Sequence, residues 1–279
     1  MADITAALVK ELRDETGVGM MECKKALVET GGDKEAAIKK LREAGMQMAA
    51  KKASRTAKQG IIAACVADDA QSGRMIEVNC ETDFVTKNET FQAFVTELLQ
   101  DADGLADDTI GEACKSKVEA KIAEIGENLV ARRNVTYQVQ GTGAVAAYVH
   151  LGGKLGVMVE VGCGKPESVQ QEAVKTMLAD LTLHITAVAP LCITRDQVPA
   201  ETVEAEKEIY AKQVEGKPEN IIDKIVSGKL DKFYSQICLV EQAFVKDQDK
   251  TVAGVLQETG KAVDDEFTIR RFVRWQLGA

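Results

Sequence analysis

The order of the expected strands and helices, which occurs twice along the chain, constrains the fold more than any other feature. Alternation of apolar and polar residues predicts the strands, and apolar residues three or four positions apart predict the helices. The first copy has two strands, two helices and a third strand at 61–67, 74–79, 91–99, 109–125 and 129–139. The second copy has its elements at 145–149, 155–159, 174–185, 251–256 and 267–275. We therefore expect an α+β fold with a duplicated core of two antiparallel-sheet subdomains.

A small helical module and a basic linker precede this core. Residues 1–56 are typical of three short helices, because Ile4, Leu8 and Leu12 form an apolar stripe and Asp33 can cap the third helix. A module of this size has a modest core, and we expect it to act in docking. The other regions are subdomain N at 57–140, subdomain C at 141–190 and 236–279, and a projecting helical hairpin at 191–235 with a break at Gly216-Lys217-Pro218.

The connection between the second strand and the next helix carries an acid and an aromatic ring together. Asp83 and Phe84 stand where the chain leaves the strand, and residues 86–89 match the capping box of the following helix. Binding residues concentrate in connections held by rigid elements, which favours a binding role. The alternative is structural, with Phe84 in the core and Asp83 as a helix-capping acid, because most aromatic residues are buried.

The charge balance argues against nucleic acid as a direct partner. Lys and Arg number 35 and Asp and Glu number 44, a net charge of −9, whereas binding to phosphate backbones needs a positive surface. The basic run from Lys51 to Lys58 leaves an RNA- or ribosome-associated adaptor as the alternative, but it lacks interleaved aromatics and is typical of a solvated linker helix. No apolar run has membrane-spanning length and residues 1–4 do not resemble a signal peptide, so we expect a cytoplasmic protein.

The sequence offers no pattern for catalysis or metal binding. The seven cysteines are scattered and form no C-x-x-C pair, which indicates free thiols rather than disulfides or a zinc site. His184 lies in an apolar helical run and is typical of a core residue, whereas His150 lies in a hairpin loop and can contact a partner. A G-x-G-x-x-A match at 141–146 is followed by a strand, which argues against a dinucleotide site. We expect no enzyme, no catalytic residue, no metal and no cofactor.

Two stretches carry a resemblance to a known family. The sequences LRDETGVGMMECKKAL at 12–27 and EVNCETDFV at 77–85 resemble the two signatures of bacterial translation elongation factor Ts. The resemblance implies a guanine-nucleotide exchange factor that promotes GDP release from elongation factor Tu and binds Tu in its GDP-bound and nucleotide-free forms. It also implies that residues 1–56 form a UBA-like module and that the hairpin at 191–235 is a dimerisation element, which gives a possible homodimer.

The resemblance also assigns roles to particular residues. Asp83 and Phe84 match a pair that enters the nucleotide-binding domain of Tu near its magnesium site, and His150 matches a histidine that touches another domain of Tu. The residues implied in contact with Tu are Leu12, Arg13, Gly17, Met20, Thr82, Asp83, Phe84, Val85, Ile125 and His150. Thr86 departs from the Ser or Ala that is usual in the family. Some members carry a further C-terminal helix, which we do not expect in this chain.

Overall fold

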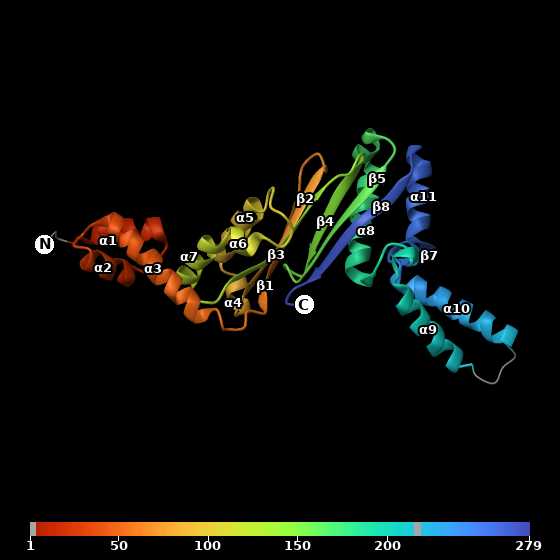
Figure 1. The fold of residues 1–279 in the computed structure, drawn as a ribbon. Helices are drawn as coiled ribbons and strands as arrows, with labels where there is room; N and C mark the ends of the chain where they lie inside the picture. Colours follow the sequence, from red (N-terminus) through yellow and green to blue (C-terminus); the bar gives the residue numbers. More distant parts are fainter. Residues whose placement is uncertain (1–3, 215–218) are drawn as a thin grey trace.

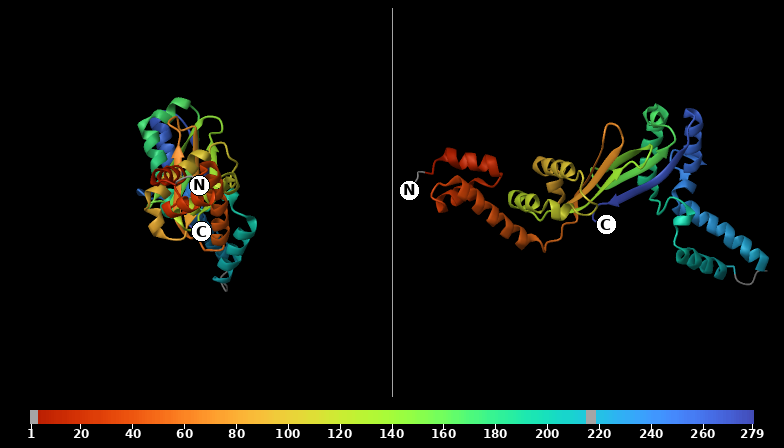
Figure 2. Two further views of the ribbon diagram at one scale, coloured as in Figure 1. Left: turned by 90° about the vertical axis from the view of Figure 1, so that its left-hand side faces the viewer. Right: turned by 45° about the horizontal axis from the view of Figure 1, so that its top comes forward.

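The chain folds into an elongated α+β structure with three parts in a row. The computed structural model describes residues 4–214 and 219–279. Figure 1 shows a helical module at one end, sheets in the middle and a helical hairpin at the other end. The right-hand view in Figure 2 shows the same separation of module and hairpin. The α+β class predicted from the sequence is confirmed, with two three-stranded antiparallel sheets at its centre.

The N-terminal module contains three helices, as predicted. They are α1 (Ala6–Thr16), α2 (Met20–Glu29) and α3 (Lys34–Lys52). The carboxylate of Asp33 caps α3 by accepting a hydrogen bond from a backbone N–H at 3.0 Å. Leu12 and Leu27 are fully buried between the helices. Lys51 and Lys52, the start of the basic run, form the last turn of α3, where positive charge complements the helix dipole.

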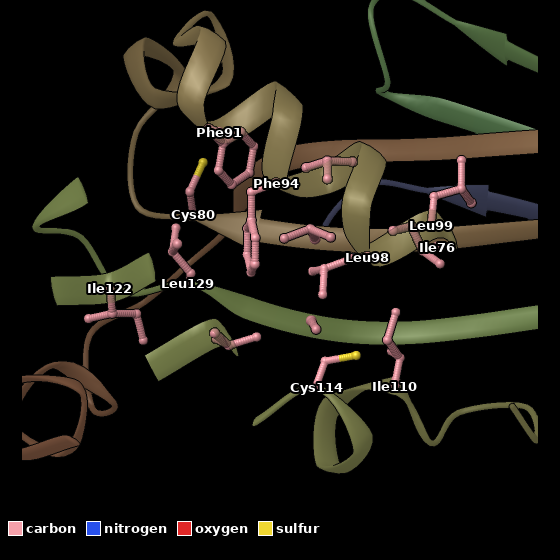
Figure 3. Close-up of a cluster of buried hydrophobic side chains, with 14 of the residues drawn as sticks. Ile76, Cys80, Phe91, Phe94, Leu98, Leu99, Ile110, Cys114, Ile122 and Leu129 are labelled. Carbon is pink, nitrogen blue, oxygen red and sulfur yellow. The ribbon is translucent and has the colours of Figure 1, made fainter. Parts of the chain in front are cut away.

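Subdomain N packs four helices against one sheet. Its strands are β1 (Gln59–Val66), β2 (Ser72–Cys80) and β3 (Val130–Gln138), with β2 in the middle. Its helices are α4 (Asp83–Thr86), α5 (Glu89–Asp101), α6 (Ile110–Ala113) and α7 (Lys115–Ile125). Phe91, Phe94 and Leu98 of α5 form the centre of the core and pack with Ile76 of β2 and with Leu129, which directly precedes β3, as Figure 3 shows. This core fixes the place where α4 begins.

The start of α5 differs from the predicted capping box. The helix begins at Glu89, and its cap is Asn88, whose side-chain oxygen accepts a hydrogen bond from the Thr90 N–H at 2.8 Å. Thr86, the predicted cap, instead ends α4 and donates its hydroxyl to the carbonyl of Asp83 at 2.7 Å. The prediction was wrong because the junction is itself a helical turn, so that the chain needs a new cap further on.

The sequence Thr-Ile-Gly-Glu at 109–112 also has the spacing of a capping box, but this prediction is wrong for a tertiary reason. Residues 109–125 form two helices, α6 and α7, rather than one. Asn134 of β3 caps α6, because its side-chain oxygen accepts hydrogen bonds from the N–H groups of Thr109 and Ile110, both at 2.9 Å. The Thr109 hydroxyl donates instead to the carbonyl of Ala106 at 2.7 Å. A residue distant in sequence has replaced the local cap.

Subdomain C repeats this arrangement. Its strands are β4 (Gly143–His150), β5 (Leu155–Cys163) and β8 (Phe267–Gln276), with β5 in the middle, and its helical elements are the 3-10 turn η1 (Pro166–Gln170), α8 (Glu172–Val188) and α11 (Val252–Val263). Thr251 caps α11, as its position predicts. His184 is fully buried, stacks on Phe244 and accepts a hydrogen bond from the Val245 N–H at 3.2 Å. Burial lowers the pKa of His184, which confirms it as a neutral core residue.

The insertion forms a helical hairpin that projects from subdomain C, as Figure 2 shows. Its helices are α9 (Ala200–Lys212) and α10 (Glu219–Ile237), and around its base lie η2 (Arg195–Gln197), η3 (Leu239–Glu241), β6 (Ala243–Phe244) and β7 (Asp247–Thr251). The predicted break at Gly216-Lys217-Pro218 lies outside the described residues. Ile209 and Ile221 are exposed, so the two helices leave part of their apolar surface uncovered.

The two subdomains are related by a repeat that also shows in short sequence motifs. The motif E-V-x-C occurs at 77–80 in β2 and at 160–163 in β5, and R-R-x-V-x-(Y/W)-Q occurs at 132–138 in β3 and at 270–276 in β8. The pairing of each central strand with its neighbour is interrupted by a β-bulge, directly after Glu77 and after Glu160, and the extra residues are Arg132 of β3 and Arg270 of β8. The order of elements alone predicted the repeat; these motifs are a second and more local signal of it.

The glutamate at the first bulge accepts hydrogen bonds from both subdomains. Glu77 is fully buried and accepts hydrogen bonds from the guanidinium of Arg133 at 2.8 Å and from the Gly278 N–H at 3.0 Å. Arg133 in turn lies over the ring of Trp275, with its central carbon 4.5 Å from the ring centroid. Burial alone would raise the pKa of Glu77, but these hydrogen bonds and the arginine charge outweigh it and lower the pKa.

The glutamate at the second bulge mirrors the first. Glu160 is fully buried and accepts hydrogen bonds from the guanidinium of Arg271 at 2.7 Å and from the Gln140 N–H at 2.8 Å. Arg271 lies over the ring of Tyr137, 4.0 Å from the ring centroid. Here too the hydrogen bonds outweigh the effect of burial and lower the pKa of the carboxyl. Each subdomain therefore completes the buried polar cluster of the other, which fixes the two sheets together.

Candidate functional site

Phe84 is a large aromatic side chain in solvent. It is 78% exposed, whereas Phe91 and Phe94 of the neighbouring helix are 0% and 2% exposed. The structural alternative, in which Phe84 belongs to the core, is therefore wrong. Since aromatic residues make up only 4% of the chain, an exposed one on a rigid element is a candidate for a binding surface.

The sequence folds this way because the neighbouring residues occupy the inside of the junction. Thr82 is extended and stands at the start of α4, and Val85 is buried in the core below. Successive residues of one helical turn point in different directions, so the burial of Val85 leaves Asp83 and Phe84 on the outer side. Both are exposed, and the junction expected as a tight connection is in fact a single helical turn.

Glu127, in the turn after α7, holds the segment from Thr82 to Val85 in place, and this segment is called the tip below. Its carboxylate accepts hydrogen bonds from the N–H groups of Glu81 at 3.1 Å and Thr82 at 3.0 Å, and from the Thr82 hydroxyl at 2.6 Å. The carboxylate of Glu81 accepts in return from the Asn128 N–H at 2.7 Å. Hydrogen bonds to a carboxylate are stronger than neutral ones, so the start of α4 is fixed. Ile125, at the end of α7, is half-buried beside this turn and packs on the same core.

The linker from the N-terminal module is attached to the same corner of subdomain N, which consists of the tip and the turn after α7. The side-chain amide of Asn128 donates to the carbonyl of Arg55 at 2.8 Å, and the guanidinium of Arg55 lies 3.5 Å from the carboxylate of Glu81. The ammonium of Lys52 donates to the carbonyl of Gly126. Two cations of the basic run are therefore engaged within the protein rather than free for another partner.

The loop between α1 and α2 lies against α7. Gly17 ends α1 with φ +67°, a left-handed conformation that favours glycine, and a Cβ at this position would lie 2.8 Å from the carboxyl carbon of Glu124. Arg13 and Met20 are exposed near this loop. Leu12 is fully buried, so its side chain supports the module from inside and does not reach a partner directly.

His150 lies at the same end of the sheets as the tip, and it is the last residue of a strand rather than part of the predicted hairpin loop. It ends β4, where its Nδ1 is 2.8 Å from the hydroxyl of Tyr148. In the turn that follows, the ammonium of Lys154 donates to the side chain of Gln59 at 3.0 Å. Gln59 begins β1 opposite Cys80, the residue from which β2 leads into α4. The predicted residues of the tip and Ile125 thus share one corner, and the His150 turn stands near it.

Two properties of the described chain bear on other kinds of site. Within residues 4–214 and 219–279, no three His, Cys, Asp or Glu side chains gather as ligands for a metal ion. None of the helices in these ranges is both long enough and apolar enough to cross a membrane.

The fold and the tip together define the class of the protein. It is an α+β protein with a duplicated core that presents an exposed aromatic ring beside a carboxylate on a rigid corner, with a helical module attached at that corner. The family model for elongation factor TS matches residues 81–279, which begin at this corner. The chain belongs to the elongation factor Ts family, whose members are translation elongation factors of protein biosynthesis.

The similarity to individual relatives extends over nearly the whole chain. The chain is 43% identical to elongation factor Ts of Nautilia profundicola, over 100% of this chain and 94% of the relative. It is also 43% identical to elongation factor Ts of Chloroherpeton thalassium, over 100% of this chain and 99% of the relative. Elongation factor Ts of Clostridium botulinum, strain Alaska E43, is 42% identical over 99% of this chain and 93% of its own length.

Proposed function

We propose that the protein is a guanine-nucleotide exchange factor that binds elongation factor Tu and promotes GDP release during translation elongation. The observation that carries this proposal is Phe84, a 78% exposed ring next to the exposed carboxylate of Asp83. Glu127 fixes the turn that carries both residues. Because the backbone of the turn is already fixed, it loses little conformational entropy when the ring enters a partner, so the corner is preorganised for binding.

The proposed mechanism is mechanical. Proteins of the partner's class hold GDP through phosphate contacts and a magnesium ion, so displacement of one element weakens several interactions together. In the proposed complex Asp83 and Phe84 enter near the magnesium site and the ring separates elements of the partner. A factor that binds nucleotide-free Tu more tightly than GDP-bound Tu must lower the affinity for GDP by the same factor. The factor makes and breaks no covalent bond in this scheme, and faster release requires that GDP leave from the ternary complex.

We assign the other contacts with the partner to surfaces on either side of the tip. Arg13, Gly17 and Met20 are exposed on the N-terminal module, which is fixed to the corner through Lys52 and Arg55. The turn after His150 supplies a further surface near the start of β1. Several separate contacts allow the factor to bind firmly while the tip acts on the nucleotide site.

The test is a stopped-flow measurement of fluorescent GDP release from Tu. We expect Phe84→Ala to slow factor-stimulated release about tenfold or more, which corresponds to about 1.4 kcal/mol of lost transition-state stabilisation. Circular dichroism and urea unfolding should match the unsubstituted protein, because the ring is exposed. Leu191→Ala is the matched control, since Leu191 is 77% exposed and lies at the hairpin base. Unchanged release with folded Phe84→Ala would overturn the proposal.

The same assay separates the alternative function, an RNA- or ribosome-associated adaptor that uses residues 51–58. Salt-sensitive RNA binding without an effect on GDP release would favour the adaptor. We further propose a homodimer through the hairpin, because Ile209 and Ile221 leave apolar surface exposed there. Light scattering of the full chain across a concentration series tests this, and a monomer throughout the series would exclude it.

A further inference from the structure

Two cysteines meet at the base of the helical hairpin. Cys192 precedes α9 and is half-buried, while Cys238 directly follows α10 and is fully buried. Their sulfur atoms lie 3.6 Å apart. The backbones pair at this point in a parallel bridge, in which the Leu239 N–H donates to the carbonyl of Cys192 at 2.9 Å and the Cys192 N–H donates to the carbonyl of Ile237 at 3.3 Å.

This geometry suits a disulfide without movement of the backbone. Paired strands lie about 4.8 Å apart, within the range of about 4.4–6.8 Å that separates the α-carbons of disulfide-bonded cysteines. Rotation of the side chains can therefore bring the two sulfur atoms to bonding distance. The other five cysteines are engaged differently: the hydrogen-bond partners of their thiols are Val18 for Cys23, Arg74 for Cys65, Thr82 for Cys80, Asp101 for Cys114 and Lys165 for Cys163.

We propose that Cys192 and Cys238 form a redox modification site, at which a peroxide converts the two thiols reversibly into a disulfide that closes the base of the hairpin. The thiolate of Cys192 attacks one oxygen of hydrogen peroxide, giving a sulfenic acid and releasing hydroxide, which takes up the proton that Cys192 lost. The Cys238 sulfur then attacks the sulfenic sulfur, and its own proton leaves with the departing hydroxide as water. Two thiols and one peroxide give one disulfide and two waters, so the two sulfur atoms supply both electrons.

The two cysteines have different roles because their surroundings differ. Cys192 is the accessible member of the pair and meets the oxidant first. Burial, together with the neighbouring Cys192 sulfur, raises the pKa of Cys238 to about 12, so Cys238 remains a thiol until the sulfenic acid forms beside it. This order follows from accessibility and from the 3.6 Å separation, which leaves the sulfenic sulfur within reach of the second thiol.

The disulfide would hold both connections of the hairpin to subdomain C. Ion pairs already bring these connections together, since Arg195 lies 2.8 Å from the carboxylate of Asp231 in α10 and 2.5 Å from that of Glu241. Oxidation would therefore fix an arrangement that the reduced protein already has. Its effect would be confined to the hairpin, whereas the tip at Phe84 lies in the other subdomain and would keep its contacts.

Peptide mapping of the full chain tests the proposal without any exchange assay. The protein is treated with one equivalent of hydrogen peroxide, unfolded and alkylated in denaturant so that buried thiols also react, and digested with trypsin without reduction. Cleavage after Lys175, Arg195, Lys232 and Lys246 gives one peptide with each cysteine, 176–195 and 233–246. We expect these two peptides as one linked species, two hydrogens lighter than their sum, which dithiothreitol separates.

Two variants make the result specific. Cys192→Ser should abolish the linked species and leave Cys238 free for alkylation, while Cys163→Ser, which removes another half-buried cysteine, should leave the linked species unchanged. As a second readout, a cut within α9 or α10 of the oxidised protein should leave the fragments joined on a non-reducing gel. The proposal is overturned if the treated protein keeps both thiols alkylatable, if oxidation stops at sulfinic acid, or if the linked peptides contain other cysteines or join two chains.

Discussion

The corner after β2 and the corner after β5 share one construction. In each, the cysteine of the E-V-x-C motif donates its thiol to a carbonyl two residues further on, at 3.1 Å for Cys80 and 3.2 Å for Cys163. In each, a carboxylate from the turn just after a later helix accepts the N–H groups of the corner, Glu127 after α7 in the first corner and Asp265 after α11 in the second. A short helical turn follows in both.

The corners differ in the side chains that they present. The first carries Asp83 and Phe84, whereas the corresponding positions of the second carry Pro166 and Glu167, which are also exposed. The shared hydrogen bonds therefore belong to the scaffold, and an aromatic ring is exposed at only one of the two corners. What each corner can present to a partner is set by the side chains on the turn rather than by its backbone.

The largest expected effect tests whether the two repeats are equivalent in energy. Glu77→Ala and Glu160→Ala each leave a pair of arginines without their buried carboxylate, and we expect each to lower the free energy of unfolding by about 3 kcal/mol. Urea unfolding of both variants measures this directly. If the two variants lose free energy of unfolding by amounts that differ by more than about 1 kcal/mol, the two buried clusters are not equivalent and one contributes more to the stability of the protein.

The carboxyl groups of Glu77 and Glu160 also make the free energy of unfolding depend on pH. Because their pKa values are lower in the folded protein than in the unfolded chain, their contribution is complete above about pH 4.3, the ordinary value for Glu, and is lost as the pH falls through the folded pKa. We therefore expect the stability of Glu77→Gln to fall less steeply in acid than that of the unsubstituted protein. Glu201→Gln, at an exposed position, is the control and should keep the original slope.

Exchanging the tips is the second test. Phe84→Glu places on the first corner the residue type of the second, and we expect factor-stimulated GDP release to slow by about 10- to 100-fold. The free energy of unfolding should change by less than about 0.5 kcal/mol, because the site is on the surface. Glu167→Phe should leave the release rate unchanged. A faster rate with Glu167→Phe would mean that the second corner also reaches the nucleotide site.

The carboxylates that hold the corners provide a third test, of intermediate size. Glu127→Ala leaves two backbone N–H groups of the first corner without their acceptor, and we expect a loss of about 1–3 kcal/mol in stability together with slower GDP release. Asp265→Ala should cost similar stability in the second corner with no change in release. Equal effects of both variants on release would show that the corners act through overall stability rather than through the position of Phe84.

The smallest effect concerns the helices that follow the corners. Asn88 caps α5 with its side chain, whereas Gln171, at the corresponding position before α8, makes no side-chain cap hydrogen bond. Asn88→Ala should therefore destabilise the protein by about 1 kcal/mol, and Gln171→Ala by only a few tenths of a kcal/mol. Thermal unfolding of the two variants checks the difference, and a larger loss with Gln171→Ala would contradict the assignment of the caps.

Periodicity predicted most of the architecture, because hydrophobic spacing depends on local geometry. The three-helix module, both sheets and the cap at Thr251 appear where the sequence indicates them. The caps at Thr86 and Thr109 failed because other groups compete for the same N–H donors: Asn88 stands closer to the start of α5, and Asn134 reaches α6 from β3. A local motif contains no information about a partner that tertiary folding supplies.

The candidate site was predicted in position but not in exposure. Composition favoured a buried Phe84, whereas its place in a connection between rigid elements and the resemblance to a family favoured a binding role. The physical reason for its exposure is that Val85 occupies the buried position of the turn, which is visible only once α4 is known to be helical. The role of Glu127 had no signal in the spacing of residues near the tip, although its carboxylate decides where the tip stands.

The hydrogen bond from Gly278 to Glu77 spans 201 residues of sequence. During synthesis at roughly 5–20 residues per second, about 10–40 s pass between the addition of the two residues. Throughout that interval β2 carries a carboxylate whose buried surroundings are incomplete, since both β8 and the turn that contains Gly278 are still missing. Subdomain N therefore cannot complete its buried polar cluster while subdomain C is being synthesised. The two subdomains reach their folded structure together, only after β8 has left the ribosome.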